Sequence, residues 1–86
     1  MDAEGVEGGC TMVKMENIIK TGNAVSMDCF EEGDRSRAHH VEFDAETLEV
    51  TNGVKVNIYI RQSIAKIWKF LREGVELPEE AISYWC

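Results

Sequence analysis

The sequence is poor in the features that mark secreted and membrane proteins. Its 86 residues contain three cysteines, Cys10, Cys29 and Cys86, with no close pair among them. Small secreted domains usually carry even, closely spaced sets of cysteines, so we expect a protein of the reducing cytoplasm. No uncharged apolar run approaches the roughly 18 residues of a membrane span, and no secretion signal is recognisable. We therefore expect a soluble cytoplasmic protein with no membrane partner.

The sequence also lacks a motif for catalysis, for a cofactor or for a metal. It has no glycine-rich phosphate loop. His39 and His40 are adjacent, and neighbouring residues of a strand point to opposite faces, so this pair is poorly suited to hold one ion. Cys29 is predicted on an inward strand face, where a thiol behaves as a small hydrophobe. We expect no enzyme activity, no cofactor and no metal site.

Basic residues are few and are concentrated in one part of the chain. The formal net charge is −7. Residues 1–50 carry twelve acidic and four basic side chains, whereas residues 51–75 carry five basic side chains and one acidic. The last eleven residues add three acids. A basic block therefore lies inside an acidic protein.

The length of the chain predicts one domain. So short a chain buries too little surface to support a second core. Residues 1–12 begin with a stretch rich in glycine and acids, which predicts a flexible acidic tail. Residues 13–86 are expected to form a single small α+β domain.

Alternating apolar residues predict two strands. Residues 24–31 place Val25, Met27 and Cys29 on one face, and residues 39–43 do the same with Val41 and Phe43. The charged segment between them, around Gly33, is expected to be a loop. Residues 13–19 show a mixed pattern and receive no assignment.

The pair Asn52-Gly53 is the strongest local signal for a hairpin. Both residues tolerate the positive φ that a type I′ turn requires. Leu48 and Val50 precede the pair, and the alternation continues through residues 54–60. We expect two further strands here.

Periodicity then changes to that of a helix. Ile60, Ile64, Ile67 and Leu71 fall on one face, and Gly74 follows as an expected left-handed C-terminal cap, which predicts a helix over residues 61–73. Pro78, followed by two glutamates, is typical of the start of a second short helix. These elements predict an α+β fold with two layers: a four-stranded antiparallel meander packed by one amphipathic helix, with a short C-terminal helix.

Three surfaces are candidates for binding a partner. The basic helix face has Arg61, Lys69 and Arg72 opposite the apolar stripe, where they are suited to phosphates or to an acidic partner, or form a solvated face. The acidic face comprises Asp28, Glu42, Asp44 and Glu49, at spacings that would allow it to imitate a phosphate backbone. The aromatic residues Trp68, Tyr84 and Trp85 exceed what one small core needs, and rim aromatics commonly anchor interfaces.

The leading hypothesis is a small protein-interaction or regulatory module without catalytic activity. Its partner would be another protein, or a second copy in a homodimer. One alternative is an acidic inhibitor that mimics nucleic acid and blocks a nucleic-acid-handling complex, as in phages and mobile elements. Another is a nucleic-acid-binding domain that acts through the basic helix, although the acidic net charge opposes direct binding.

Overall fold

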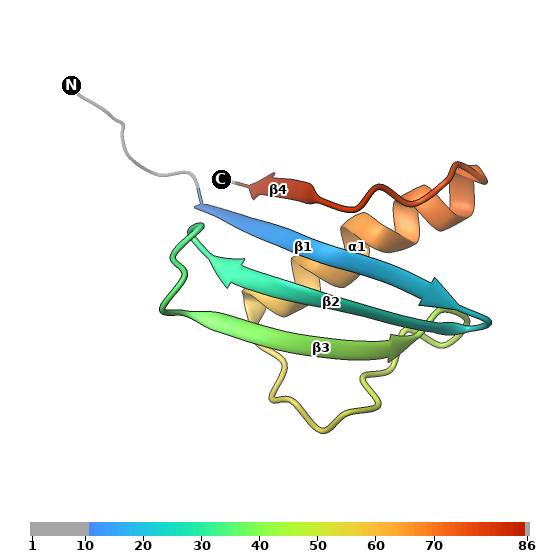
Figure 1. Ribbon diagram of the computed structural model, residues 1–86, viewed down its shortest axis with the longest axis horizontal. Coiled ribbons are helices and arrows are strands. Elements are labelled where there is room, and N and C mark those ends of the chain that lie inside the picture. The colour runs from blue at the N-terminus through green and yellow to red at the C-terminus, as the bar shows by residue number, and fades with distance from the viewer. Residues whose placement is uncertain (1–10, 86) are drawn as a thin grey trace.

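The computed structural model describes residues 11–85 as four strands and one helix. The strands are β1 (Thr11–Thr21), β2 (Ala24–Glu31), β3 (Ala38–Asp44) and β4 (Ala81–Trp85), and the helix is α1 (Ile58–Glu73). The strands form one antiparallel sheet in the order β3-β2-β1-β4. Figure 1 shows α1 running behind this sheet, across the face opposite to the viewer. The predicted α+β class with a four-stranded antiparallel sheet is confirmed.

The core lies between α1 and the sheet face that it covers. The predicted alternation in β2 is confirmed, because Val25, Met27 and Cys29 are fully buried. From the helix, Ile60 and Ile67 are also fully buried, and they belong to the same cluster of apolar side chains. The period of two in the strands and of about 3.6 in the helix thus direct their apolar sides toward each other.

β1 was not assigned from the sequence because its alternation is interrupted. Val13 and Met15 face the core, but the pairing with β2 shifts register between Glu16 and Ile19. Asn17 has φ of 54° at this irregularity, and the two isoleucines that follow it differ in solvent exposure. Ile18 is buried, whereas Ile19 is 57% exposed. A bulge of this kind breaks the pattern that a sequence reading depends on.

The hairpin predicted at Asn52-Gly53 is wrong. Residues 45–57 form an irregular segment that contains no strand, and only an isolated bridge joins Val50 to Phe43 of β3. Instead of turning back into a sheet, Asn52 donates a side-chain hydrogen bond to the carbonyl oxygen of His40 at 2.9 Å. Gly53 does have the positive φ expected of it, at 79°. The segment lies along the outer edge of β3 and covers part of it.

The helix has well-formed ends, and its start was predicted three residues too late. Asn57 is the N-terminal cap, and its Oδ1 accepts a hydrogen bond from the backbone N–H of Ile60 at 3.0 Å. Gly74 caps the other end with φ of 73°, as predicted. The alternation of residues 54–58 therefore leads into the helix, which begins at Ile58, and not into a returning strand.

The C-terminal segment and the strand order also differ from expectation. Residues 81–85 form strand β4, so the short helix expected after Pro78 is wrong. The sheet is not a four-stranded meander, because β4 pairs with β1 and brings Ala81 opposite Met15. The predicted tail of residues 1–12 is too long, since Thr11 and Met12 belong to β1. Residues 1–10 lie outside the described part of the chain.

Within residues 11–85, no helix has the length and apolar character that crossing a membrane requires.

Candidate functional site

The outer edge of β4 carries unpaired backbone groups. The carbonyl oxygen of Met12 accepts from the N–H of Glu32, on the β2 side of β1. Before the bulge, the backbone N–H and C=O groups of the even-numbered residues of β1 therefore point toward β2, and those of its odd-numbered residues point toward β4. These odd-numbered residues pair with the odd-numbered residues of β4. The N–H and C=O groups of Ile82 and Tyr84 consequently point away from the sheet. No hydrogen bond between residues of the described part of the chain involves these outward groups.

A groove runs between this edge and α1. It has a volume of about 390 Å³ and is open to solvent. Residues 82–84 of β4 form one wall, and Gln62, Ala65, Lys66 and Lys69 of α1 form the other. The exposed Ala65 contributes only a methyl group to the helix wall, and it is followed by Lys66 at the next position and by Lys69 one turn further on. The groove thus combines free backbone groups on one side with positive charge on the other.

The basic helix face is exposed as predicted. Arg61, Lys69 and Arg72 all lie on the solvent side of α1. Within residues 11–85, none of them forms an ion pair with a carboxylate. The guanidinium of Arg72 instead lies 4.7 Å from the ring centre of Trp68. Two of the basic residues of α1, Lys66 and Lys69, line the groove. Lys66 was not among the predicted binding residues, so the structure adds it to this face.

The three predicted aromatic anchors have different environments. Tyr84 is 69% exposed and Trp68 is 39% exposed, so both are accessible to a partner. Trp85 is half-buried and packs edge-on against Tyr59, with 5.7 Å between ring centres. Tyr84 lies at the groove, whereas Trp68 is not among its lining residues. The aromatic residues therefore do not form a single patch.

Two residues of the predicted acidic face lie on the sheet surface that α1 leaves open. The side chain of His40 contacts both of them, with Nδ1 at 2.9 Å from Asp28 and Nε2 at 3.0 Å from Glu42. Asn17 donates a further hydrogen bond to Asp28 at 2.9 Å. This hydrogen bond and that from His40 hold the pKa of the Asp28 carboxyl below its ordinary value. The same contacts to both carboxylates raise the pKa of His40.

Of the other two residues of the predicted acidic face, Asp44 is the last residue of β3, and Glu49 lies beyond that strand. Asp44 accepts hydrogen bonds from the backbone N–H groups of Glu46 and Thr47, at 2.7 and 3.1 Å. Its carboxylate therefore shapes a turn, as aspartate often does. Glu49 is exposed in the segment beside β3. The structure thus does not align all four predicted acids in one row.

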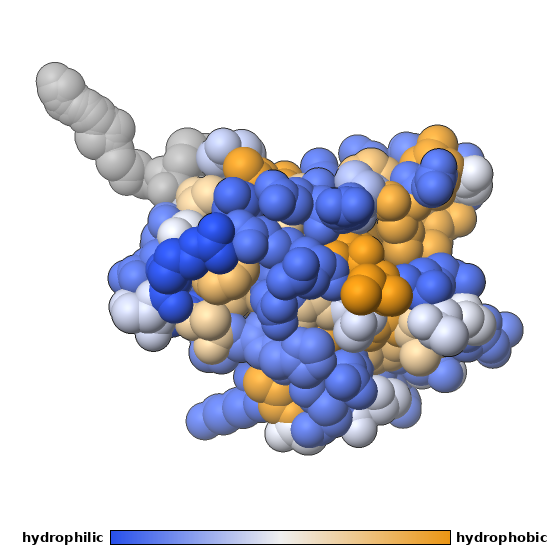
Figure 2. Space-filling view, viewed as in Figure 1, coloured by the Kyte–Doolittle hydropathy of each residue, from blue (hydrophilic) through white to orange (hydrophobic). Residues whose placement is uncertain are grey.

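Basic residues interrupt the acidic character of the open sheet face. Arg35 makes two hydrogen bonds to the Glu16 carboxylate, at 2.9 and 2.7 Å, and lies 4.5 Å from the ring centre of Phe30. Lys14 lies 3.1 Å from the same carboxylate. Figure 2 shows this face as largely hydrophilic, with smaller apolar patches between the hydrophilic residues. Its carboxylates are therefore mostly matched by neighbouring donors.

A buried carboxylate with three hydrogen-bond donors lies near the start of α1, and this cluster was not predicted from the sequence. Glu31 is only 7% exposed, and it receives hydrogen bonds from Arg37, from His39 at 2.6 Å and from Asn57 at 2.9 Å. Burial raises the pKa of Glu31, but the hydrogen bonds from His39, Asn57 and Arg37 outweigh it and lower the pKa overall. Because each acceptor oxygen is engaged, we assign this cluster the role of joining β2, β3 and α1. The residues come together only through the fold, so spacing along the chain gave no signal.

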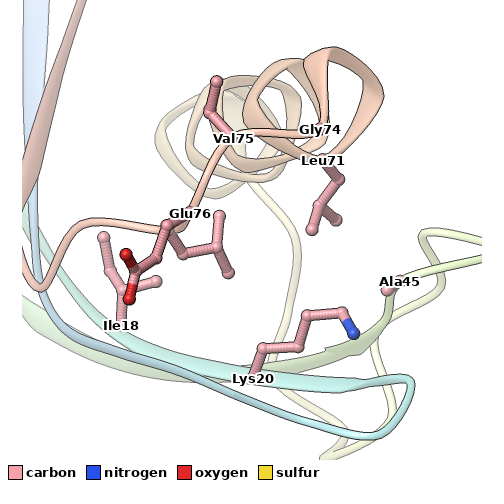
Figure 3. Close-up of a pocket in the computed structure, with 8 residues that line it drawn as sticks. Ile18, Lys20, Ala45, Leu71, Gly74, Val75 and Glu76 are labelled. Carbon is pink, nitrogen blue, oxygen red and sulfur yellow. The ribbon is translucent and has the colours of Figure 1, made fainter.

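A second groove, larger than the one beside β4, lies at the other end of the helix. It has a volume of about 600 Å³ and is wide open, and its apolar wall includes Ile18, Leu71 and Leu77. In Figure 3, the Lys20 side chain extends across the groove floor toward Ala45. Its Nζ donates to the carbonyl oxygen of Gly22 at 2.6 Å, so the cation is held within its own hairpin. The groove offers no group of polar side chains that converge on a ligand.

Two searches for known chemistry gave no site. Residues 11–85 contain no group of three or more histidine, cysteine, aspartate or glutamate side chains placed to hold a metal ion. Comparison with family models, with curated proteins and with solved structures found nothing that matches this chain.

Proposed function

We propose that this chain is a small protein-interaction module of the cytoplasm. It is a two-layer scaffold without catalytic activity. Its contact surface is the outer edge of β4 together with the adjoining face of α1. The observation that carries the proposal is the unpaired edge of β4. Free strand edges are ready templates for another chain, and proteins usually protect them.

The two edge strands of the sheet differ in how far the rest of the described chain covers them. At the β3 edge, the backbone N–H of Asp44 donates to Glu49, and the N–H of Thr51 donates to Glu42, at 2.9 and 2.7 Å. This edge is therefore partly covered by the chain itself. The segment of β4, Ala-Ile-Ser-Tyr-Trp, has neither a charge nor a proline that would discourage pairing. Within residues 11–85, the β3 edge is partly covered and the β4 edge is not, and this difference favours β4 as the binding edge.

The geometry gives less support to the two nucleic-acid alternatives. An inhibitor that mimics nucleic acid needs a row of free carboxylates, yet Asp28 and Glu42 share His40, and Asp44 shapes a turn. Direct nucleic-acid binding needs several cations in a surrounding that does not repel phosphate. The helix face supplies cations, but the protein as a whole has a net charge of −7.

Substitution of Tyr84 by proline tests the proposal. Proline lacks the backbone N–H, and at an outward position of an edge strand this removes a docking group but no bond of the sheet. The full-length protein and its Tyr84→Phe variant should capture the same protein from nuclease-treated cell extract, whereas Tyr84→Pro should lose it. A partner that binds Tyr84→Pro as well as the unaltered protein would contradict the proposal.

Two controls make this test specific. Urea denaturation should show that Tyr84→Pro remains folded, with a stability near that of Tyr84→Phe. Ser83→Pro should be clearly less stable, because Ser83 pairs with Val13 inside the sheet and its N–H faces β1. If the two proline variants are equally unstable, the assignment of Tyr84 to the outward edge is wrong.

A further inference from the structure

We propose that the segment bound at this edge is an extended, acidic peptide of another protein, which adds to β4 as a fifth strand and places carboxylates against Lys66 and Lys69. This inference rests on the function proposed above and specifies the chemistry of the partner. Addition of a strand to a sheet edge beside a helix is an established mode of peptide recognition, in which backbone bonds give affinity and alternate side chains give specificity.

The backbone of β4 sets the length of the peptide segment. Ile82 and Tyr84 each offer one N–H and one C=O on the outer side, as the pairing of β4 with β1 requires. A peptide strand that uses all of these groups spans about five residues at roughly 3.3 Å per residue. The bound segment is therefore short and extended, and it contains no proline at the positions that donate to β4.

Side-chain alternation along the added strand sets its composition. Ala81, Ser83 and Trp85 lie on the side of β4 that faces α1, because they pair with the inward positions of β1. A peptide residue opposite Ser83 points the same way, into the groove lined by Lys66 and Lys69. A carboxylate there meets two cations that form no ion pair among residues 11–85.

The alternate residues of the peptide lie on the open side of the sheet. They stand beside Ile82 and Tyr84, whose exposed fractions are 38% and 69%. Cross-strand neighbours of aromatic and β-branched type stabilise a pair of strands. The preferred segment therefore alternates acidic residues with β-branched or aromatic ones.

Charge makes a second copy of this chain a poor occupant. If two β4 strands paired edge to edge, each would bring its own α1 alongside, with Lys66 and Lys69 on the wall next to the junction. Four lysines would then lie about one groove without a carboxylate among the lining residues. Like charges across an interface disfavour association. An acidic peptide has the opposite charge and fits the same backbone edge.

The test uses two capped six-residue peptides, one alternating glutamate with valine and one alternating lysine with valine. The full-length protein should bind the glutamate peptide, and hydrogen exchange of the Ile82 and Tyr84 amides should slow in the complex. Replacement of Lys66 and Lys69 by glutamate should weaken the glutamate peptide at least tenfold and strengthen the lysine peptide. A matched control, K20E/K55E, changes the net charge equally at residues that lie outside the groove and outside the basic helix face, and it should alter affinity less than threefold.

The outcomes separate this inference from the proposed function. If Tyr84→Pro loses its cellular partner but K66E/K69E binds the glutamate peptide normally, the acidic specificity is wrong and the β4 edge remains a binding site. Absence of binding at millimolar glutamate peptide overturns the acidic partner in the same way. If Tyr84→Pro keeps its cellular partner, both proposals fail.

Two further measurements identify other occupants of the edge. A dimer in sedimentation velocity at about 100 µM, absent in Tyr84→Pro, would assign the edge to a second copy and overturn the peptide. The first residues of the chain are themselves acidic, with Asp2, Glu4 and Glu7. If the full chain with these three changed to the corresponding amides binds the glutamate peptide at least tenfold more tightly, the groove belongs to that segment.

Discussion

Asn57 connects the first turn of α1 to β2 through Glu31. Its Nδ2 donates to the Glu31 carboxylate at 2.9 Å, while its Oδ1 accepts from the backbone N–H of Ile60 at 3.0 Å. Both ends of the amide are therefore used: the oxygen caps the helix, and the nitrogen donates a hydrogen bond to a buried carboxylate. This explains how a helix with no acidic residue in its first turn is fixed at its start.

Substitution of Asn57 by aspartate should destabilise the protein, although aspartate is usually as good an N-cap as asparagine. The new carboxylate would face Glu31, and two like charges at hydrogen-bond distance repel. Asn57→Ser keeps a cap without the charge, so it should be the more stable variant at pH 7, by about 1–2 kcal/mol. Urea denaturation measures both. The difference should shrink at pH 4, where a carboxylate takes up a proton, and a difference independent of pH would contradict this account.

The thiol of Cys29 should be inert in the folded protein. The side chain is fully buried, and burial raises its pKa from 9.0 to about 11. At pH 8 only about 0.1% of such a thiol is ionised, and the thiolate is the reactive form. In a C10S/C86S variant, iodoacetamide should therefore label Cys29 only as fast as the protein unfolds. Rapid labelling without denaturant, at the rate of a model thiol, would show that Cys29 is accessible.

The local elements that the sequence predicted are those with an uninterrupted period. β2 follows its alternation from Val25 to Cys29, and α1 follows its stripe from Ile60 to Ile67. β1 was missed because the irregularity at Asn17 changes which side chains face the core. The hairpin at Asn52 failed for a different reason. The alternation after it is not buried on one side, since Val56 is 47% exposed, and Asn57 starts a helix instead.

The candidate site depends on a pairing that no local pattern encodes. Pro78 with its two glutamates resembles a helix start, but residues 81–85 lie beside β1 and pair with it across some 70 positions of sequence. Only this pairing places Tyr84 at an edge and Ser83 inside the ladder. Lys69 was predicted as a binding residue from its position opposite the apolar stripe of the helix, whereas the position of Lys66 at the groove follows only from the pairing of β4.

Stability should fall as pH rises through the titration of His40. Contacts with Asp28 and Glu42, at 2.9 and 3.0 Å, raise the pKa of His40 above 6.5 in the folded protein. The protonated form is then favoured by folding, so this contribution is fully present below pH 6.5 and is lost above the folded-state pKa. The free energy of unfolding should decrease between pH 6 and pH 8.5, and His40→Gln should flatten that decrease. An equally steep decrease in His40→Gln would exclude His40 as its source.

Ile67 and Ile19 carry the same side chain in opposite environments, so their alanine variants test the core directly. Ile67 is fully buried between α1 and the sheet, and its truncation should cost about 2–5 kcal/mol because it leaves a cavity. A domain of this size has a total stability of only about 5 kcal/mol, so Ile67→Ala should be largely unfolded at 37 °C. If Ile67→Ala is too unfolded to measure, Ile67→Val can replace it, because the smaller truncation should cost only about 1 kcal/mol. Ile19 is 57% exposed, and Ile19→Ala should change the unfolding free energy by less than about 0.5 kcal/mol. Equal losses at both positions in urea denaturation would mean that Ile19 also packs against a partner surface, or that the register after Asn17 is wrong.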